Sequence, residues 1–260
     1  MSSATPIAVI GGSGLYSLFD GSPERVETPY GPALVTTGEL AGRPVAFLTR
    51  HGVDHSVAPH LINYRANVWA LASLGVRAIV SSAAVGGITA PPGSFVLSDQ
   101  FIDRTWGRSD TFYDRGSVQH LPAADPFCPV LREVAVAAVP DASPTGTVVV
   151  IQGPRFSTRA ESEWFRAAGA DIVNMTLYPE VPLAAELNIG TVNLAYVTDA
   201  DAAPADEQLT AELVFGRFAE AQPRIIAAIE AIVAGIPDDY RARELIAPAE
   251  VAAVLARATS

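Results

Sequence analysis

The residues with the clearest chemical potential are two aspartates that follow an apolar stretch. Residues 191–201 read TVNLAYVTDAD, which predicts a buried β-strand over 191–197 and then a short turn that carries Asp199 and Asp201. A carboxylate beside buried apolar residues is costly unless hydrogen bonds or a ligand compensate it. Ligands of open α/β folds bind beyond the carboxyl ends of strands. We therefore interpret the pair as ligand contacts, with an N-cap or turn acid as the alternative.

A glycine-rich segment near the start of the chain is suited to an anion. Residues 7–10 (IAVI) predict a central strand that runs into GGSGL at 11–15. Glycines there allow the backbone to approach an anion, and Ser13 adds a hydroxyl. The third glycine of a dinucleotide-binding fingerprint is missing, so that interpretation is weak, and a simple tight turn is the remaining alternative.

A cationic segment follows the strand predicted over 44–49. Arg50 is a permanent cation and His51 a hydrogen-bond donor, which together indicate an anion clamp. His55 and His60 lie close behind, but no helical histidine motif and no cysteine accompany them, so we expect no metal. A solvated basic turn is the alternative to the clamp.

Small residues follow the strand predicted over 78–82. Residues 82–87 read SAAVGG. Small side chains at a strand end leave backbone N–H groups accessible to a ligand, and they equally permit close packing. The sequence leaves both interpretations open.

Strands and helices alternate along the whole chain. This predicts a single α/β domain over residues 1–260, with a mostly parallel or mixed central β-sheet flanked by helices. Further strands are predicted over 34–37 and 44–49, joined as a hairpin, and over 95–102, 147–151 and 171–175. Helices are predicted over 62–74, 129–138, 160–168, 182–188, 209–234 and, singly or as a pair, 241–256, so that the C-terminal helices start from about 205. Residues 103–127 are irregular, and a segment of that length is usually functional or lies at an interface.

The composition indicates a folded protein. The chain has 260 residues, of which 49% are hydrophobic and 17% charged, which suits a packed core and excludes disorder. The net charge of −11 argues against nucleic-acid binding. The single cysteine, Cys128, excludes an intrachain disulfide. The sequence has no signal-peptide pattern and no run of roughly 18 apolar residues, so we expect a soluble cytoplasmic protein without membrane contact.

From about residue 7 to about residue 215, the chain closely resembles the trimeric purine nucleoside phosphorylases, and within them the 5′-methylthioadenosine phosphorylases. The most specific motifs are IGGSGL, TPYG, RHG, NYRANVWAL, DQFIDRT, DPFCP, GPRFSTRAES, NMTLYPEV and VTDAD. The resemblance implies a pentosyltransferase of purine salvage, in which inorganic phosphate attacks the anomeric carbon of a nucleoside and the purine leaves. It also implies a nucleoside-phosphorylase-like fold, a homotrimer, and no cofactor besides phosphate as co-substrate.

The resemblance also implies roles for individual residues. It places phosphate at Ser13, Arg50, His51, the backbone of Ala83 and Ala84, and Thr176; the sugar at Met175; and the base at Phe156, Ser157, Asp199 and Asp201. His120, on the irregular segment, is implied to reach the sugar site of a neighbouring subunit. Similar phosphorylases often have threonine at the position of Ser13 and a hydroxyl residue at the position of Ala83.

In this interpretation Asp199 is the general acid. The departing purine gathers negative charge and needs a proton at N7, while phosphate stabilises the cation-like sugar. Burial, the phosphate charge and Asp201 are expected to raise the pKa of Asp199, so that it can carry that proton. Asp201 would accept a hydrogen bond from the exocyclic amine of adenine.

Two positions favour adenine over a 6-oxopurine. The related 6-oxopurine phosphorylases have asparagine at the position of Asp199 and glutamate at that of Ser157, and a carboxylate would repel a 6-keto oxygen. The 5′ substituent is expected to face Leu213 and Val214, which suit methylthio better than hydroxyl. A 5′-halo-5′-deoxyadenosine is an alternative substrate, and a general purine nucleoside phosphorylase acting on adenosine or inosine is an alternative activity.

Two rival hypotheses come from other classes. A hydrolytic nucleosidase would use water as nucleophile, and Arg50 with His51 argues against it. A dinucleotide-binding or non-catalytic nucleoside-binding protein would need a more complete glycine fingerprint than residues 11–15 provide.

Overall fold

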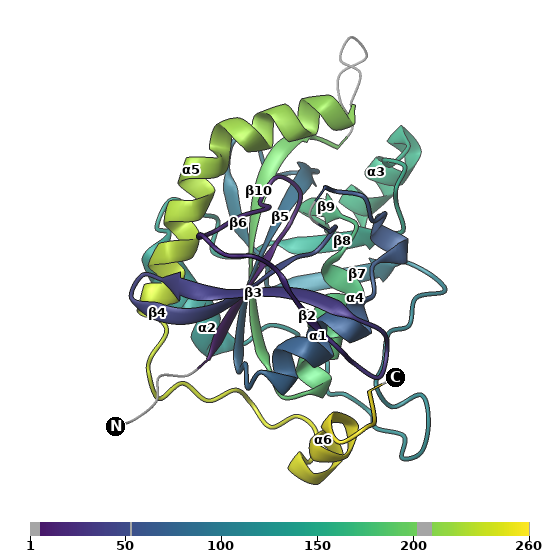
Figure 1. Ribbon diagram of the computed structural model, residues 1–260. Helices are drawn as coiled ribbons and strands as arrows, with labels where there is room; N and C mark the ends of the chain where they lie inside the picture. Colours follow the sequence, from purple (N-terminus) through teal and green to yellow (C-terminus); the bar gives the residue numbers. More distant parts are fainter. Residues whose placement is uncertain (1–5, 53, 202–209, 260) are drawn as a thin grey trace.

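The computed structural model describes residues 6–52, 54–201 and 210–259, which form one mixed ten-stranded sheet with helices packed around it (Figure 1). The strands follow in the order β2-β3-β4-β1-β5-β9-β8-β7, and β10 pairs with β5 and β6. The strands are β1 Ile7–Gly11, β2 Glu24–Val26, β3 Ala33–Leu40, β4 Arg43–Thr49, β5 Ala78–Gly87, β6 Phe95–Leu97, β7 Gln100–Arg104, β8 Thr147–Ile151, β9 Ile172–Asn174 and β10 Gly190–Ala200. The helices are α1 Tyr64–Ser73, α2 Pro129–Ala138, α3 Arg159–Ala167, α4 Leu177–Glu186, α5 Ala211–Gly235 and α6 Pro248–Leu255, with a short 3-10 helix at Pro59–Leu61. The predicted fold class is confirmed.

The parallel pair of β5 and β10 runs through the centre of the sheet. Both strands extend further than predicted, and Asp199 lies within β10 rather than in a turn after it. The register skips Thr198, because Val197 pairs with Val85 and Asp199 with Gly86. Such a bulge adds a residue to one strand and re-aims the side chains that follow. The predicted turn at Asp199 is therefore wrong, whereas Asp201 does follow the strand directly.

One edge of β5 is open in the second half of the strand. β1 pairs with Ala78–Ser81 on this edge, and β9 pairs with Gly86 and Gly87. Within the described chain, no strand covers the edge over residues 82–85. Backbone N–H and C=O groups on such an edge need side-chain or ligand partners. The small residues after Ser81 thus form a backbone-lined opening inside the sheet.

Three other predicted elements differ from the structure. The strand predicted over 95–102 is two strands, because β6 runs antiparallel to β10 and β7 then pairs in parallel with β8. Helix α4 begins at Leu177 rather than at residue 182, with Tyr178 and Pro179 in non-helical conformations. Within 241–256 the structure forms one helix, as one of the two alternatives predicted, but α6 begins at Pro248 rather than at residue 241.

The remaining predictions hold in outline. The hairpin of β3 and β4 and the irregular segment between β7 and α2 are confirmed. The start of the C-terminal helices, predicted near residue 205, lies outside the described residues, and α5 begins at Ala211 after Thr210, whose hydroxyl accepts the Leu213 N–H.

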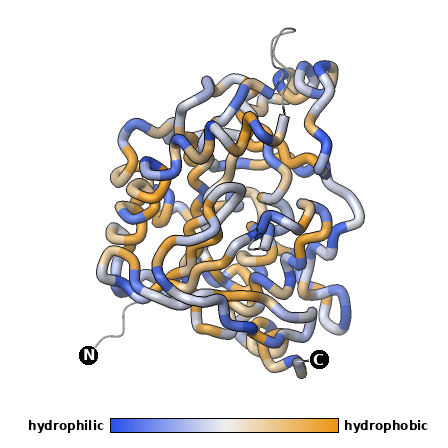
Figure 2. The backbone as a smooth tube through the Cα atoms, turned by 45° about the horizontal axis from the view of Figure 1, so that its top comes forward, coloured by the Kyte–Doolittle hydropathy of each residue, from blue (hydrophilic) through white to orange (hydrophobic). Residues whose placement is uncertain are grey.

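The hydrophobic core has a layer on each face of the sheet. Alternate residues of β1 show the division, because Ile7 and Val9 pack with residues of α2 and α5, whereas Ala8 and Ile10 pack with residues of α1, α4 and α6. Figure 2 shows hydrophobic residues frequent on the inner strands and hydrophilic residues frequent in the outer loops. Among the described helices, none has both the length and the apolar character to span a membrane.

The irregular segment is anchored to α4 by a buried carboxylate and a buried ring. Glu186 accepts hydrogen bonds from Thr111 Oγ1 (2.6 Å) and from the Phe112 N–H (2.7 Å). The Phe112 side chain is fully buried in the layer formed by α1, α4 and α6. The first part of this segment is therefore fixed to the body of the protein.

Replacing Phe112 with alanine should lower the free energy of unfolding by about 3–5 kcal/mol, because the cavity left behind adds to the lost transfer energy. Urea denaturation followed by circular dichroism measures the change. The matched control is Val130→Ala at the start of α2, where the side chain is 43% exposed and little effect is expected. Equal changes for the two variants would show that Phe112 does not anchor the segment.

Candidate active site

A cavity of about 310 Å³ lies at the carboxyl ends of the central strands. The predicted site residues that line it come from distant segments of the chain: His51, Ala84, Phe156, Met175, Asp199, Asp201 and Val214. A larger cavity of about 560 Å³ lies at the opposite ends of the strands, beside Arg77 and α6, and no predicted site residue lines it. The 310 Å³ cavity is therefore the candidate active site.

The other predicted residues lie beside this cavity or away from it. Arg50, Ala83 and Thr176 are buried and adjoin lining residues in the chain, and the buried Ser157 hydroxyl follows Phe156. Ser13 lies in the glycine-rich turn after β1. His120 is exposed and does not line the cavity, so within one subunit it stands apart from the other residues.

Both aspartates line the cavity at the end of β10, Asp199 within the strand and Asp201 directly after it. They are two residues apart and so share a face of the strand, and their exposed fractions are 4% and 6%. The Thr198 hydroxyl donates a hydrogen bond to Asp199 Oδ1 at 2.6 Å. Gly86 lies opposite, where a Cβ would come within 3.2 Å of Asp201 Cβ and 3.3 Å of Asp199 Oδ2. The glycine thus leaves room for two carboxylates beside the sheet.

Asp201 is held from its backbone and its side chain. Its N–H donates to the Gly87 carbonyl at 2.9 Å, and the Ser162 hydroxyl donates to Oδ2 of its carboxylate. Burial raises the pKa of Asp201, and hydrogen bonds from the hydroxyls of Ser162 and then Ser157 lower it in part. One carboxylate oxygen is therefore engaged by α3, and the residue also lines the cavity.

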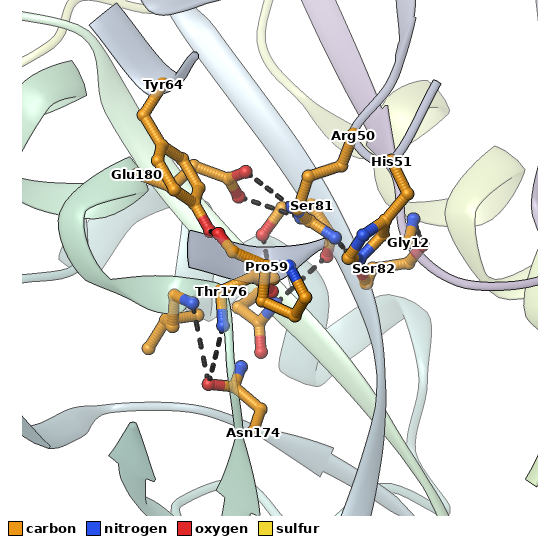
Figure 3. A network of polar contacts seen from close by, with 12 residues as sticks. Gly12, Arg50, His51, Pro59, Tyr64, Ser81, Ser82, Asn174, Thr176 and Glu180 are labelled. Carbon is orange, nitrogen blue, oxygen red and sulfur yellow. Dashed lines mark hydrogen bonds and ion pairs between the residues drawn. The ribbon is translucent and has the colours of Figure 1, made fainter. Parts of the chain in front are cut away.

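Arg50 forms the centre of a buried ionic network (Figure 3). Its Nε and Nη2 donate to the two Glu180 oxygens at 2.6 and 2.8 Å, and Nη1 donates to the Ser82 carbonyl at 3.0 Å. Burial lowers the pKa of Arg50, but the Glu180 carboxylate more than offsets this, so the group stays charged. A guanidinium has five N–H groups. These contacts engage three of them and leave one N–H on each terminal nitrogen for a further acceptor.

The glycine-rich turn and β5 meet at this arginine. The Gly12 N–H donates to Ser82 Oγ at 3.3 Å. A Cβ at position 12 would lie 2.6 Å from the Ser82 carbonyl oxygen and 3.0 Å from Arg50 Nη1, so no larger residue fits without displacing them. Backbone N–H groups, the open edge of β5 and a cation thus converge on one place. Such an arrangement suits a small oxyanion.

His51 differs from the predicted donor. Its Nδ1 lies 2.9 Å from the Val57 carbonyl oxygen, which can only accept, so Nδ1 carries the hydrogen. Burial lowers the pKa of His51 to about 4, which keeps the ring neutral near pH 7. Nε2 is then an acceptor. As it stands, His51 would accept from a protonated oxygen rather than donate to an anion.

Several residues that line the cavity are not among the site residues predicted from the sequence. His55, Gly86, Asn174, Ala211 and Phe215 also line the cavity, whereas the predicted Leu213 does not. The His55 ring lies 4.4 Å from that of His51 and 4.9 Å from that of Phe215, between centroids. The sequence does contain an indication that His55 belongs to the site, because it follows the Arg50-His51 pair closely. The position of Phe215 depends on how the start of α5 packs, which no local pattern reveals.

Comparison with known proteins identifies the family. The Phosphorylase superfamily profile matches residues 6–234, and the chain belongs to this family. It is 53% identical over 202 residues to an S-methyl-5′-thioadenosine phosphorylase of Mycolicibacterium smegmatis, covering 75% of this chain and 77% of the relative. It is 46% identical to the enzyme of the same name from Thermofilum pendens, with 90% and 94% covered, and 45% identical to a purine nucleoside phosphorylase of Streptomyces coelicolor, with 89% of each covered.

Solved structures agree with the sequence relatives. A methylthioadenosine phosphorylase from Schistosoma mansoni, in complex with adenine, superposes with a TM-score of 0.87 at 33% identity, over 96% of this chain and 97% of that one. The predicted family and its α/β fold are thereby confirmed.

The depressed pKa of His51 has a consequence for stability. The folded protein favours the neutral His51 ring, whereas the unfolded chain takes up a proton below the ordinary pKa of 6.5. The free energy of unfolding therefore has its full value above pH 6.5 and decreases as the pH falls toward about 4. His51→Gln should remove this loss, which amounts to about 3 kcal/mol. Denaturation at several pH values measures it, with His120→Gln at an exposed histidine as the control. An equal loss of stability in the His51 variant and the parent protein over this pH range would contradict the claim that the folded protein keeps His51 neutral.

Proposed function

We propose that this protein catalyses phosphorolysis of 5′-deoxy-5′-methylthioadenosine to adenine and 5-methylthioribose 1-phosphate. A phosphate oxygen forms a bond to C1′ of the sugar, the bond from C1′ to N9 breaks, and its electron pair leaves with the purine. The observation that carries the proposal is the cavity itself, which two buried aspartates line and which lies beside the paired Arg50, next in the chain to the lining residue His51. The names of the relatives support it, because several are S-methyl-5′-thioadenosine phosphorylases.

We assign the incoming phosphate to the region where the glycine-rich turn, β5 and Arg50 meet. The two terminal N–H groups of Arg50 that Glu180 and Ser82 leave available can hold one oxyanion in a fork. Ser13, the backbone of Ala83 and Ala84, and Thr176 would supply further donors. The acceptor Nε2 of His51 suits the hydroxyl of a protonated phosphate or of the sugar. Phosphate placed here also stabilises the cation-like sugar.

We assign the purine to the aspartate side of the cavity. Phe156 offers a ring for stacking, and Asp199 would donate a proton to N7 as the bond to the sugar breaks. The charges of phosphate and of Asp201 in the same cavity favour a protonated Asp199 in the complex. Asp201, beside Ser157, would accept from the exocyclic amine of adenine.

We assign the 5′ substituent to the apolar start of α5. Val214 and Phe215 line the cavity together with Ala211, and the His55 ring packs against Phe215. Met175 is assigned to the ribose. An apolar pocket favours a methylthio group over a hydroxyl by about 1–3 kcal/mol, and it also accepts a 5′-halogen.

A homotrimer is part of the proposal. The irregular segment exposes Trp106 and Val118, at 67% and 69%, and carries the exposed His120. Exposed apolar side chains of this size suit an interface between copies of the chain, from which His120 would enter the neighbouring sugar site. We propose no cofactor besides phosphate; among the described residues, no cluster of three or more His, Cys, Asp or Glu side chains could hold a metal. A cytoplasmic location stays a prediction.

The proposed reaction requires phosphate. Purified protein incubated with methylthioadenosine should release adenine only when phosphate is added, because in the proposed reaction phosphate, held beside Arg50, is the nucleophile. Release of adenine is followed by chromatography, with adenosine and inosine as comparison substrates. Equal rates with and without phosphate would identify a hydrolase instead, and binding of NAD without turnover of any nucleoside would identify a binding protein.

The proposed acid is tested by an isosteric change. Asp199→Asn should lower kcat for methylthioadenosine by about 10²- to 10⁴-fold, because the amide cannot deliver a proton to the departing purine. Asp54→Asn, at an exposed aspartate close to His55 in the chain, is the matched control and should retain the parent rate. Full activity of the Asp199→Asn variant would show that Asp199 is not the general acid.

A further inference from the structure

Ser162 is a buried hydroxyl with a specific target. It lies in the first turn of α3, has an exposed fraction of 2%, and does not line the cavity. Its hydroxyl contacts Asp201 Oδ2 and also lies 3.1 Å from the Thr158 carbonyl oxygen. A hydroxyl has one hydrogen to donate. The contact with Asp201 is the shorter one and is charge-assisted when the carboxylate is ionised, so the hydrogen goes to Asp201.

The surroundings of Asp201 make its hydroxyl donors important, and of the two, Ser162 and Ser157, Ser162 has the larger effect on the Asp201 pKa. Among the described residues, Asp201 forms no ion pair. Two acids lie near it, Asp199 at the end of β10 and Glu161 on α3. Arg155 is already paired to Glu161 by two hydrogen bonds of 2.7 Å, and Arg217 on α5 donates to the Thr198 carbonyl at 3.1 Å. Gly86, on β5, adds no charge. Burial therefore opposes ionisation of Asp201, and a hydroxyl donor rather than a cation opposes that effect.

The protonation state of Asp201 decides which purine it can hold. An ionised carboxylate only accepts hydrogen bonds, which matches the 6-amino group of adenine and repels a 6-oxo oxygen. A protonated carboxyl can donate, and it would then match the 6-oxo group of hypoxanthine. The same side chain can thus select either base, depending on where one proton lies.

We propose that Ser162 is a specificity-determining positioning residue, which holds Asp201 as an ionised acceptor and so selects a 6-aminopurine against a 6-oxopurine. This rests on the proposed function, because it presumes that a purine nucleoside occupies the cavity. Ser162 acts through Asp201 and touches no substrate. Removal of its hydroxyl should therefore change the choice of base more than the handling of phosphate.

The test compares two substrates that differ only at the base, methylthioadenosine and 5′-deoxy-5′-methylthioinosine. In Ser162→Ala, the ratio of kcat/KM for the amino substrate to kcat/KM for the oxo substrate should fall by about tenfold or more, and further at lower pH, while KM for phosphate stays unchanged. Ser162→Cys, with a weak donor of similar size, should fall between the parent protein and the alanine variant. The graded series also keeps the test informative if the alanine variant folds poorly.

The matched control is Thr28→Val. Thr28 is also fully buried and its hydroxyl donates a hydrogen bond, to the Gly31 carbonyl at 2.5 Å, but it contacts none of the proposed site residues. This variant should leave the substrate ratio unchanged even if it lowers stability. Equal losses on both substrates in the Ser162 variants, with an unchanged ratio, would show a merely structural hydroxyl and overturn the proposal. A parent protein that cleaves neither substrate would instead overturn the proposed function, and this proposal with it.

Discussion

The pairing of β5 with β10 is the constraint on which the site depends. These strands run parallel from Ala78 and Gly190 to Gly87 and Ala200, and their carboxyl ends bring the open edge of β5 beside the two aspartates. Because successive side chains of a strand point to opposite faces, a slip of one residue would turn Asp199 and Asp201 away from the cavity. The register of the β5–β10 pair therefore determines the geometry of the site.

A buried polar network fixes that register. Asn193 is paired with Ser81 across the two strands, and its Nδ2 donates to Ser81 Oγ at 2.9 Å, while Ser98 donates to Asn193 Oδ1. All three side chains have exposed fractions of 1% or less. A shifted register would leave these polar groups buried without partners, at a cost of about 1–3 kcal/mol each. The polar core therefore stabilises one alignment of the apolar strands.

Charge is distributed unevenly around the cavity. Arg50 is matched by a buried carboxylate, Glu180, so its orientation is fixed before any anion arrives. Among the described residues, the partners of Asp201 are hydroxyl groups and the backbone, and His51 is held neutral. A nucleoside phosphorylase has to accept an anion and release a purine that carries negative charge. Rigid donors on one side and carboxylates in a buried cavity on the other are consistent with both tasks.

Local sequence patterns predicted much of the site because the residues at strand ends sit in short, distinctive motifs. Asp199, Asp201, His51 and Met175 all line the cavity, as expected from the segments that carry them. The patterns could not reveal the bulge at Thr198, since a register forms only when two distant strands meet. Glu180 lies within the motif NMTLYPEV, yet its role depends on Arg50, 130 residues away in the chain. The acceptor state of His51 likewise depends on burial and on the Val57 carbonyl, neither of which the residue type indicates.

The most direct measurement is a crystal structure of the protein with methylthioadenosine and sulfate, the latter in place of phosphate. The account predicts the adenine N7 within hydrogen-bond distance of the Asp199 carboxyl and the sulfate against the two remaining terminal N–H groups of Arg50, with the sugar between them. A base bound away from β10, or a sulfate that contacts neither Arg50 nor the glycine-rich turn, would contradict it.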